Sequence, residues 1–333
     1  MGVIGIDPLV LEDLDLFAGC AAADLKVLAS RLESRQVAGG EILMRQGEAG
    51  EWFALVIGGE AAINFTDPDG ERSLGVAGAG SILGELALLR AAPRSATVRA
   101  TIPLTALIGD ADAFAVLVEV AGVRDRLTRA AAQKLAAHAT PVDVVLRDGS
   151  PVQLRPVLPS DRRGLEAGLA HMSPESLRRR FFSAGQPPDG ILNYLVDLDY
   201  VRHFAWVAID ADTTGVAMAR YVRGQEDPTS AEIAIGIVDG YQRRGLGTLL
   251  LGALGAAASS AGVARFTGEA LEENIPIRRL LERVGATWSR GEPGVVTTTV
   301  DVEMAARLVE HEIARRLGEV ARATINAADF ALA

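Results

Sequence analysis

The sequence predicts two domains: a first domain of many short strands flanked by helices, and a second domain of the α/β class. The chain has 333 residues, which exceeds one ordinary domain and suits two, each with its own core. Between residues 41 and 108, short apolar runs alternate with glycine-containing turns such as Gly58-Gly59, a pattern typical of a sandwich or barrel. After residue 151, strand-like runs alternate with helical stretches, which indicates an α/β layout.

Helices are expected on both sides of the first strand-rich region. Leucines recur at helical spacing over residues 21–34, and residues 111–138 return to a helical pattern that ends before Pro141. The expected strands between them are residues 41–45, 52–57, 61–65, 73–77, 96–101 and 104–108. Residues 1–138 are therefore predicted to form the first domain, and residues 139–150 are predicted to link it to the second.

The second domain is predicted over residues 151–302. Its expected strands are residues 152–157, 204–210, 215–221 and 231–238, with further strands near the end. Its expected helices are residues 160–170, 174–182, 245–261 and 274–284. A charged helical tail, residues 303–333, closes the chain.

Composition and charge exclude several classes of protein. A net charge of -10 argues against a chain that grips a polyphosphate backbone, so nucleic acid is not an expected partner. The single cysteine, Cys20, cannot form an internal disulfide, which fits a reducing compartment. The apolar stretch at 249–261 is short and framed by charge, so no membrane span is expected. A cytoplasmic location follows, and the spacing of Asp, Glu and His predicts no metal site.

The first motif with chemical meaning is the run Gly-Glu-Leu-Ala-Leu-Leu at residues 84–89, followed by Pro-Arg-Ser-Ala-Thr-Val at 93–98. A cyclic phosphate needs backbone amides at a helix start, a guanidinium for two oxygens, and a carboxylate for the ribose hydroxyl. This stretch resembles the phosphate-binding cassette of the cyclic nucleotide-binding family, as do residues 45–48 and 58–60. The resemblance covers roughly residues 15–138 and implies a β-roll, similar to a jelly roll, with flanking helices.

The same resemblance assigns roles within this cassette. It implies that Glu85 binds the ribose 2′-hydroxyl, that Arg94 binds the cyclic phosphate, and that main-chain amides complete the cradle at Gly84, Leu86, Ala87 and Ser95. Ser95 stands where cAMP-selective members commonly have alanine, and its hydroxyl could also donate to the guanine of cyclic GMP. We expect cAMP as the first ligand and cyclic GMP as a second. The alternative is a β-roll that no longer binds a nucleotide.

The second motif is Gln-Arg-Arg-Gly-Leu-Gly-Thr at residues 242–248, between an apolar strand and a helix. Glycines there let the backbone approach a pyrophosphate, and the amides and the helix dipole neutralise its charge. Alone, such a turn could be a plain strand-to-helix connection. The motif resembles that of the GNAT acetyltransferases, as do residues 154–157 and the pair Asn274 and Pro276. The resemblance spans about residues 150–300 and implies a GNAT fold.

The GNAT resemblance also implies a cosubstrate and its ligands. Acetyl-CoA is expected at Val238, Arg243, Arg244, Gly245, Leu246, Gly247 and Thr248, with Asn274 near the thioester. A free lysine has a pKa of about 10.4, so a base must accept its proton on or before attack. Glu232, at the start of the apolar strand, is the predicted general base; the alternative is a solvated glutamate at a strand end. Leu281 occupies the position where many GNAT enzymes carry a tyrosine that protonates the leaving thiolate.

The order of the two domains resembles that of the cAMP-dependent bacterial protein lysine acetyltransferases over nearly the whole chain. The resemblance implies acetyl transfer to lysines of partner proteins, such as acyl-CoA synthetases or universal stress proteins, with cAMP as allosteric effector. Two alternatives stay open: a cAMP sensor without catalysis, and an N-acetyltransferase for a small amine. We hypothesise that residues 162–203 cover the lysine site until cAMP acts, with the tail after Glu303 as the second candidate. His171 and His203 are predicted to be structural.

Overall fold

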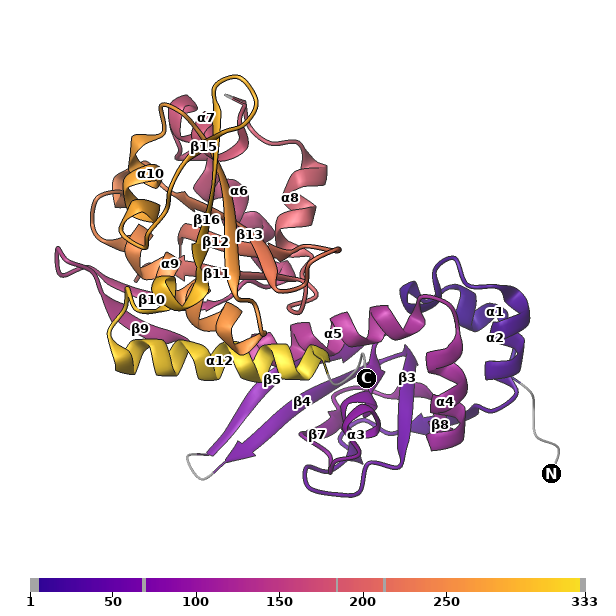
Figure 1. Cartoon of the computed structure of the whole chain (residues 1–333). Helices are drawn as coiled ribbons and strands as arrows, with labels where there is room; N and C mark the ends of the chain where they lie inside the picture. The colour runs from indigo at the N-terminus through magenta and orange to yellow at the C-terminus, as the bar shows by residue number, and fades with distance from the viewer. Residues whose placement is uncertain (1–5, 68–69, 184, 212–213, 330–333) are drawn as a thin grey trace, which may run out of the picture. The chain divides into compact units, whose positions relative to one another are not determined.

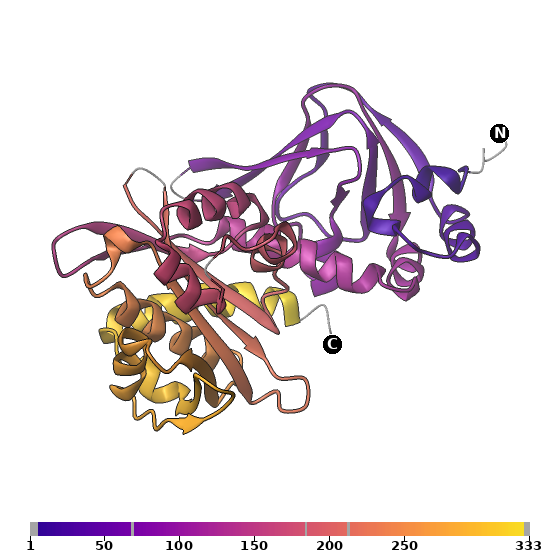
Figure 2. The ribbon, with the colours of Figure 1, turned by 90° about the horizontal axis from the view of Figure 1, so that it is seen from above.

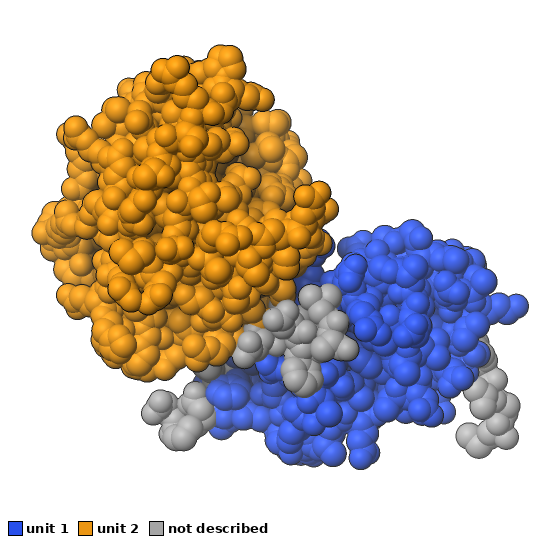
Figure 3. Space-filling model, viewed as in Figure 1, with its two compact units in different colours: residues 1–131, 329–333 blue, residues 132–328 orange. Residues whose placement is uncertain are grey.

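The computed structural model describes residues 6–67, 70–183, 185–211 and 214–329. Figure 3 shows the chain as two compact units, unit 1 with residues 1–131 and 329–333, and unit 2 with residues 132–328. The boundary falls inside helix α5 (Val123–His138), whose first half packs in the core of unit 1 while Ala132 and Ala136 pack in the core of unit 2. The segment predicted as a linker carries strand β9, which belongs to the sheet of unit 2.

Unit 1 is a β-roll of two four-stranded sheets, with strand orders β1-β8-β3-β6 and β2-β7-β4-β5. The strands are β1 (Glu33–Val37), β2 (Ile42–Met44), β3 (Trp52–Gly58), β4 (Glu60–Asp67), β5 (Gly70–Gly78), β6 (Ile82–Leu83), β7 (Thr97–Ala100) and β8 (Leu104–Asp110). Strand β3 is buried on both faces: Phe53 and Leu55 pack with the helices, whereas Ala54 and Val56 pack between the sheets. Figures 1 and 2 show this unit in indigo to purple.

Helices flank the β-roll of unit 1, as the sequence predicts. They are α1 (Leu9–Glu12), η1 (Asp15–Phe17), α2 (Ala22–Ala29), α3 (Glu85–Arg90), α4 (Ala111–Glu119) and the start of α5. The predicted helix over 21–34 is too long, because the chain from Glu33 onward pairs with β8. The predicted helix over 111–138 is broken into α4 and α5, because Val120 has an extended backbone and Gly122 has a φ of +76°.

Unit 2 is built on one eight-stranded sheet with the order β15-β16-β14-β13-β12-β11-β10-β9. The strands are β9 (Val142–Val145), β10 (Pro151–Pro156), β11 (His203–Ile209), β12 (Gly215–Arg223), β13 (Ser230–Ile237), β14 (Arg265–Leu271), β15 (Ser289–Arg290) and β16 (Val295–Asp301). The neighbours β13 and β14 are parallel, and their pairing ends at Glu232 and Thr267. Beyond this point the two strands part, so residues 233–237 of β13 have no ladder partner on the β14 side.

Helices cover both faces of this sheet, as an α/β layout requires. They are α6 (Arg162–Ala170), α7 (Pro174–Phe181), α8 (Asp189–Val196), α9 (Leu246–Ser260), α10 (Ile275–Glu282), α11 (Val302–Ala306) and α12 (His311–Asp329), with the short turns η2 (Pro159–Asp161) and η3 (Asp239–Tyr241). On one face, Trp206 Nε1 donates to the carbonyl of Ala253 in α9 at 3.0 Å. On the other face, Arg180 of α7 lies over Gly236 of β13.

The tail helix α12 is part of the core of unit 2. Its Leu317, Ala321 and Ile325 are buried in the same apolar cluster as α9. Helix α11, which precedes α12, approaches α9 closely because α9 has a glycine there. A Cβ at Gly255 would lie 2.4 Å from the backbone nitrogen of Ala306. The predicted fold class is thus confirmed in both units.

Candidate functional site

The first predicted site begins at Gly84, which ends β6 and caps the N-terminus of α3. Its φ of +81° lies in the left-handed region, which glycine adopts without strain. A Cβ at this position would lie 2.3 Å from Nη1 of Arg94 and 3.0 Å from the carbonyl oxygen of Trp52. Glycine is required here because the arginine side chain passes directly beneath the turn.

Arg94 is the buried cation of this site, with 4% of its surface exposed. Its Nη1 donates to the carbonyl of Gly84 at 3.0 Å, and its Nη2 donates to the carbonyl of Trp52 at 2.6 Å. The guanidinium carbon lies 4.8 Å from the centre of the Trp52 ring. Burial lowers the pKa of Arg94 and the carboxylates of Glu85 and Glu48 act against this, but a guanidinium stays charged at neutral pH.

Glu85 provides the carboxylate of the same site and is 2% exposed. It is the first residue of α3, so the structure brings a buried carboxylate, a buried guanidinium and a helix start together. Ala87 is buried against the chain at Gly50, where a Cβ would lie 2.2 Å from the Ala87 Cβ. Leu86 is half-buried and Ser95 is exposed. The geometry suits a ligand with one anionic group and one hydroxyl.

The second predicted site lies in unit 2, in a cavity of about 730 Å³. The cavity occupies the opening between β13 and β14, with α7, the loop before α9 and the start of α10 as its other walls. Of the predicted residues, the cavity is lined by Glu232, Arg243, Gly245, Gly247, Thr248 and Asn274. These predicted residues, which lie up to 42 positions apart in the sequence, thus surround one space that is large enough for an extended cosubstrate.

The loop before α9 presents backbone donors to this cavity. Gly245 caps α9 with a φ of +94°, and Arg243 also has a positive φ, of +62°. The first amides of a helix have no partner within the helix, so they form a ready site for an anion. The side chain of Leu246 is 1% exposed and anchors this loop in the core.

Three of the predicted cosubstrate residues, Val238, Arg244 and Leu246, do not line the large cavity. Val238 lines a smaller cavity of about 90 Å³ beside α6 instead. Arg244 turns away: it pairs with Asp148 at 3.0 Å, and its guanidinium lies 4.8 Å from the centre of the Tyr241 ring. In its place Arg147, from the turn between β9 and β10, lines the large cavity. Sequence reasoning missed Arg147 because its segment was predicted to be a linker.

Glu232 lies where β13 and β14 part, and two arginines accompany it. Arg220 of β12 is on the same face of the sheet, because Glu232 pairs in register with Val222. Burial lowers the pKa of Arg220, while Tyr194 and Glu232 act in the opposite direction. Burial and then the charge of Arg220 lower the pKa of Arg180 to about 9, and Glu232 again opposes the shift. The negative charge of Glu232 therefore interacts with both guanidinium groups. The sequence analysis did not predict either arginine as part of the site.

Neither predicted structural histidine lines the large cavity. His203 is 6% exposed and its ring lies 4.8 Å from the ring of Tyr194. Burial and then the charge of Arg220 lower the pKa of His203 to about 3, so it is neutral at physiological pH. His171 is exposed, and its Nδ1 lies 2.7 Å from the carbonyl oxygen of Ala167.

The position that carries tyrosine in many GNAT enzymes is apolar in this structure as well. Leu281 is 2% exposed and lines the large cavity. Among the residues that the structure describes, no tyrosine lines that cavity. A proton for a leaving thiolate must therefore come from another source.

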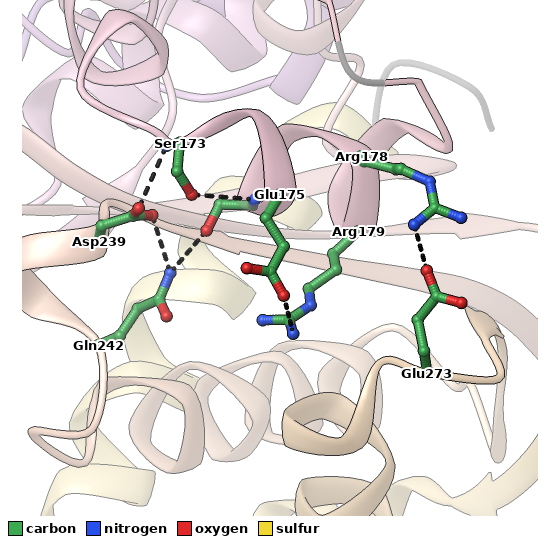
Figure 4. A network of polar contacts seen from close by, with 8 residues as sticks. Ser173, Glu175, Arg178, Arg179, Asp239, Gln242 and Glu273 are labelled. Atoms are coloured by element: carbon green, nitrogen blue, oxygen red, sulfur yellow. Dashed lines mark hydrogen bonds and ion pairs between the residues drawn. The ribbon is translucent and has the colours of Figure 1, made fainter.

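Helix α7 forms one wall of the cavity, and its polar contacts with the loop before α9 and the segment before α10 are shown in Figure 4. Near its N-terminal end, the side-chain amide of Gln242 donates to Ser176 Oγ and to Asp239 Oδ1, each at 3.1 Å. Near its C-terminal end, Arg178 forms an ion pair with Glu273, next to the start of α10. We call these two groups of contacts the α7 latch, because they connect a wall of the cavity to the segments on either side of it.

Two further features are absent from the described part of the chain. No helix there is long and apolar enough to cross a membrane. Within the same residues, no three or more side chains of His, Cys, Asp and Glu gather in a way that could hold a metal ion.

Comparisons with known proteins identify both domains. The model of the cyclic nucleotide-binding domain matches residues 34–120, and that of the acetyltransferase (GNAT) domain matches residues 152–287. Acetyltransferase Pat of Mycolicibacterium smegmatis is 41% identical over 293 residues, which is 88% of each chain. A cAMP-dependent protein kinase regulatory subunit of Mycosarcoma maydis is 40% identical over 90 residues, 27% of this chain and 17% of that protein.

A solved structure extends this likeness to the whole fold. The structure of the cAMP-binding acyltransferase from Mycobacterium smegmatis is 37% identical, with a TM-score of 0.52. The match covers 96% of this chain and 97% of that one. The chain therefore belongs to the family of acetyltransferases in which a cyclic nucleotide-binding domain precedes a GNAT domain.

Proposed function

We propose that this chain transfers the acetyl group of acetyl-CoA to the ε-amine of protein lysines, under the control of cAMP. The observation that carries the proposal is the position of Glu232, in the same cavity as the glycine loop at residues 243–248. One space thus contains a candidate proton acceptor and a candidate anion cradle. The matched relatives, an acetyltransferase and a cAMP-binding acyltransferase, support both halves of the proposal.

Acetyl-CoA would lie along the opening between β13 and β14. The free amides at the start of α9 suit its pyrophosphate, and the arginines on the rim add positive charge. The open edge of β13 at residues 233–237 suits the amide groups of the pantetheine arm, because its own backbone groups lack a strand partner there. Asn274, 8% exposed at the start of α10, faces the same space.

The chemistry would follow direct attack. Glu232 takes a proton from the lysine ammonium, and the neutral nitrogen then attacks the thioester carbonyl carbon. The C–N bond forms, the C–S bond breaks, and CoA leaves as a thiolate, while the attacking nitrogen releases its remaining extra proton to water. Leu281 cannot donate a proton, so the thiolate takes its proton from water.

Helix α7 is the segment that we propose as the regulatory cover. It lies within residues 162–203, it lines the cavity, and its Arg180 senses the charge of Glu232. The tail helix α12 is the weaker candidate, since it packs in the core and none of its described residues lines the cavity. cAMP would act by favouring a state in which the α7 latch is open, which requires tighter cAMP binding to that state.

The nucleotide site would use Arg94 for the cyclic phosphate and Glu85 for the ribose hydroxyl. Both are buried and adjacent, which strengthens charge-assisted hydrogen bonds. Cyclic GMP is the second proposed ligand, because the exposed hydroxyl of Ser95 could donate a hydrogen bond to its guanine. Calorimetric titration with each nucleotide decides the order of preference.

The proposal is tested by a reaction with the full chain. Acetyl-CoA is incubated with an acyl-CoA synthetase or a universal stress protein as acceptor, with and without cAMP, and acetylated lysines are located by mass spectrometry. Glu232→Gln should lower the rate by about 100-fold, the lower range for loss of a general base, and spare acetyl-CoA binding. Glu269→Gln, which also lines the cavity, is the matched control and should keep the rate.

Each other outcome rejects a defined part of the proposal. An unchanged rate for Glu232→Gln removes the base role. Acetylation of a small amine but of no protein removes the lysine substrates. Binding of both ligands without turnover leaves a regulator in place of an enzyme.

A further inference from the structure

The turn between β9 and β10 is held in one conformation by several hydrogen bonds. The backbone of Leu146 donates to Ser150 at 2.8 Å, and that of Gly149 donates back to Leu146 at 3.0 Å. The backbone N–H of Ser150 also donates to Oδ1 of Asp148 at 3.1 Å, and Gly149 has a φ of +86°. The turn therefore fixes the directions in which Arg147 and Asp148 leave the backbone.

This turn is fastened to the glycine loop through Arg244. The backbone N–H of Arg147 donates to the carbonyl of Arg244 at 3.2 Å. The side chain of Arg244 returns the contact, with Asp148 Oδ2 at 3.0 Å and Ser150 Oγ at 3.4 Å. The guanidinium group of Arg244 thus binds the turn, and the carboxylate of Asp148 balances its charge.

The side chain of Arg147 runs along the start of α9. A Cβ at Gly245 would lie 3.2 Å from Cγ of Arg147 and 3.3 Å from its Cδ and Nε. Arg147 is exposed and lines the large cavity. In the described part of the chain, no carboxylate forms an ion pair with it. An uncompensated guanidinium therefore lies beside the free amides of a fifteen-residue helix.

We propose that Arg147 binds a phosphate group of the CoA thioester and supplies the charge that the sequence assigns to Arg244. The inference rests on the proposed use of acetyl-CoA. A guanidinium beside a helix N-terminus suits a phosphate because both donate to its oxygens and both carry positive charge. CoA offers two such groups, the diphosphate and the 3′-phosphate, and the proximity to α9 favours the diphosphate.

The test is calorimetry on the full chain with CoA and with 3′-dephospho-CoA, at two salt concentrations. Arg147→Ala should weaken CoA binding about tenfold and reduce its dependence on salt, because an exposed charge contact is screened by ions. Arg147→Lys should recover part of the affinity. Arg290→Ala removes another exposed arginine, outside the cavity, and should change nothing. Equal loss for both ligands identifies the diphosphate, and loss for CoA alone identifies the 3′-phosphate.

The inference and the proposed function fail in different ways. If wild type gives no heat with CoA or acetyl-CoA, the proposed cosubstrate is wrong. If wild type binds and Arg147→Ala binds within twofold of it, at both salt concentrations, Arg147 has no role and the inference is overturned. Cyclic AMP binding and the melting temperature of each variant show that the chain is folded.

Discussion

The two glycine turns of this chain have the same type of backbone conformation, but the side chains around them differ in burial. Gly84 and Gly245 both cap a helix with a positive φ, and both lie against an arginine side chain. At Gly84 that arginine is Arg94, 4% exposed and bonded to two main-chain carbonyls. At Gly245 it is Arg147, which is exposed at the rim of a cavity of about 730 Å³.

The difference matches what each ligand has to do. A buried, fixed cation binds strongly because little solvent screens it and no side-chain freedom is lost on binding. Such a site suits an effector whose binding must favour one conformation. An open rim of exposed arginines binds less tightly but lets a large cosubstrate enter and leave in every turnover. The same backbone conformation, a glycine at a helix start, therefore suits both tight binding of an effector and weaker binding of a cosubstrate.

The largest expected effect comes from adding a methyl group at each turn. Gly84→Ala should weaken cAMP binding about 100-fold, since the Cβ displaces Arg94 from charge-assisted bonds that are worth about 1.5–3 kcal/mol each. Gly245→Ala should weaken acetyl-CoA binding only about tenfold, because its cost is left-handed strain of about 1–2 kcal/mol and the Arg147 side chain can move. Calorimetry with both ligands measures each variant.

Each variant is the control for the other. Gly84→Ala should leave acetyl-CoA binding unchanged, and Gly245→Ala should leave cAMP binding unchanged. Equal losses at the two turns would show that the surroundings of the glycine do not matter, which contradicts the comparison.

A smaller effect is expected at Trp52, which supports Arg94 from one side. Trp52→Leu should weaken cAMP binding about fivefold, because a cation–π contact of about 1 kcal/mol is lost. Trp52→Phe keeps an aromatic face and should stay closer to wild type. The measurement is calorimetric affinity, supported by tryptophan fluorescence; the change in emission on cAMP binding should be smaller for Trp52→Phe, which keeps two of the three tryptophans. Equal affinity for the Leu and Phe variants would remove this role.

The smallest effect is expected at the α7 latch. Arg178→Ala should raise the acetylation rate without cAMP by about twofold, because an exposed ion pair contributes at most about 1 kcal/mol. Arg265→Ala breaks another exposed ion pair, with Asp227, away from the cavity and is the matched control. A lower rate for Arg178→Ala would mean that the pair supports the active state, contrary to the proposed cover.

The nucleotide site was predictable because its parts are close in sequence. Gly84, Glu85 and Arg94 lie within eleven positions, so their types and spacing carried the geometry, and the structure brings them together. Glu232 was predictable from strand alternation and the family pattern, and it lies in the cavity. Its catalytic role stays a prediction until its variant is assayed.

The missed residues reach the cavity across long separations. Arg147 meets Arg244 through a backbone bond between segments 97 positions apart, and no local pattern announces such a bond. Arg180 and Arg220 come from a helix and a strand whose packing is set by the whole sheet. The break between α4 and α5 depended on the backbone at Val120 and Gly122, which helical periodicity does not report.

The parting of β13 and β14 also has a consequence for handling the protein. An unpaired strand edge is a template on which another chain can add a strand. Residues 233–237 form such an edge whenever the space beside them is empty. We therefore expect the purified enzyme to keep its colloidal stability better in storage with CoA present, since the cosubstrate would then occupy the place of a missing strand.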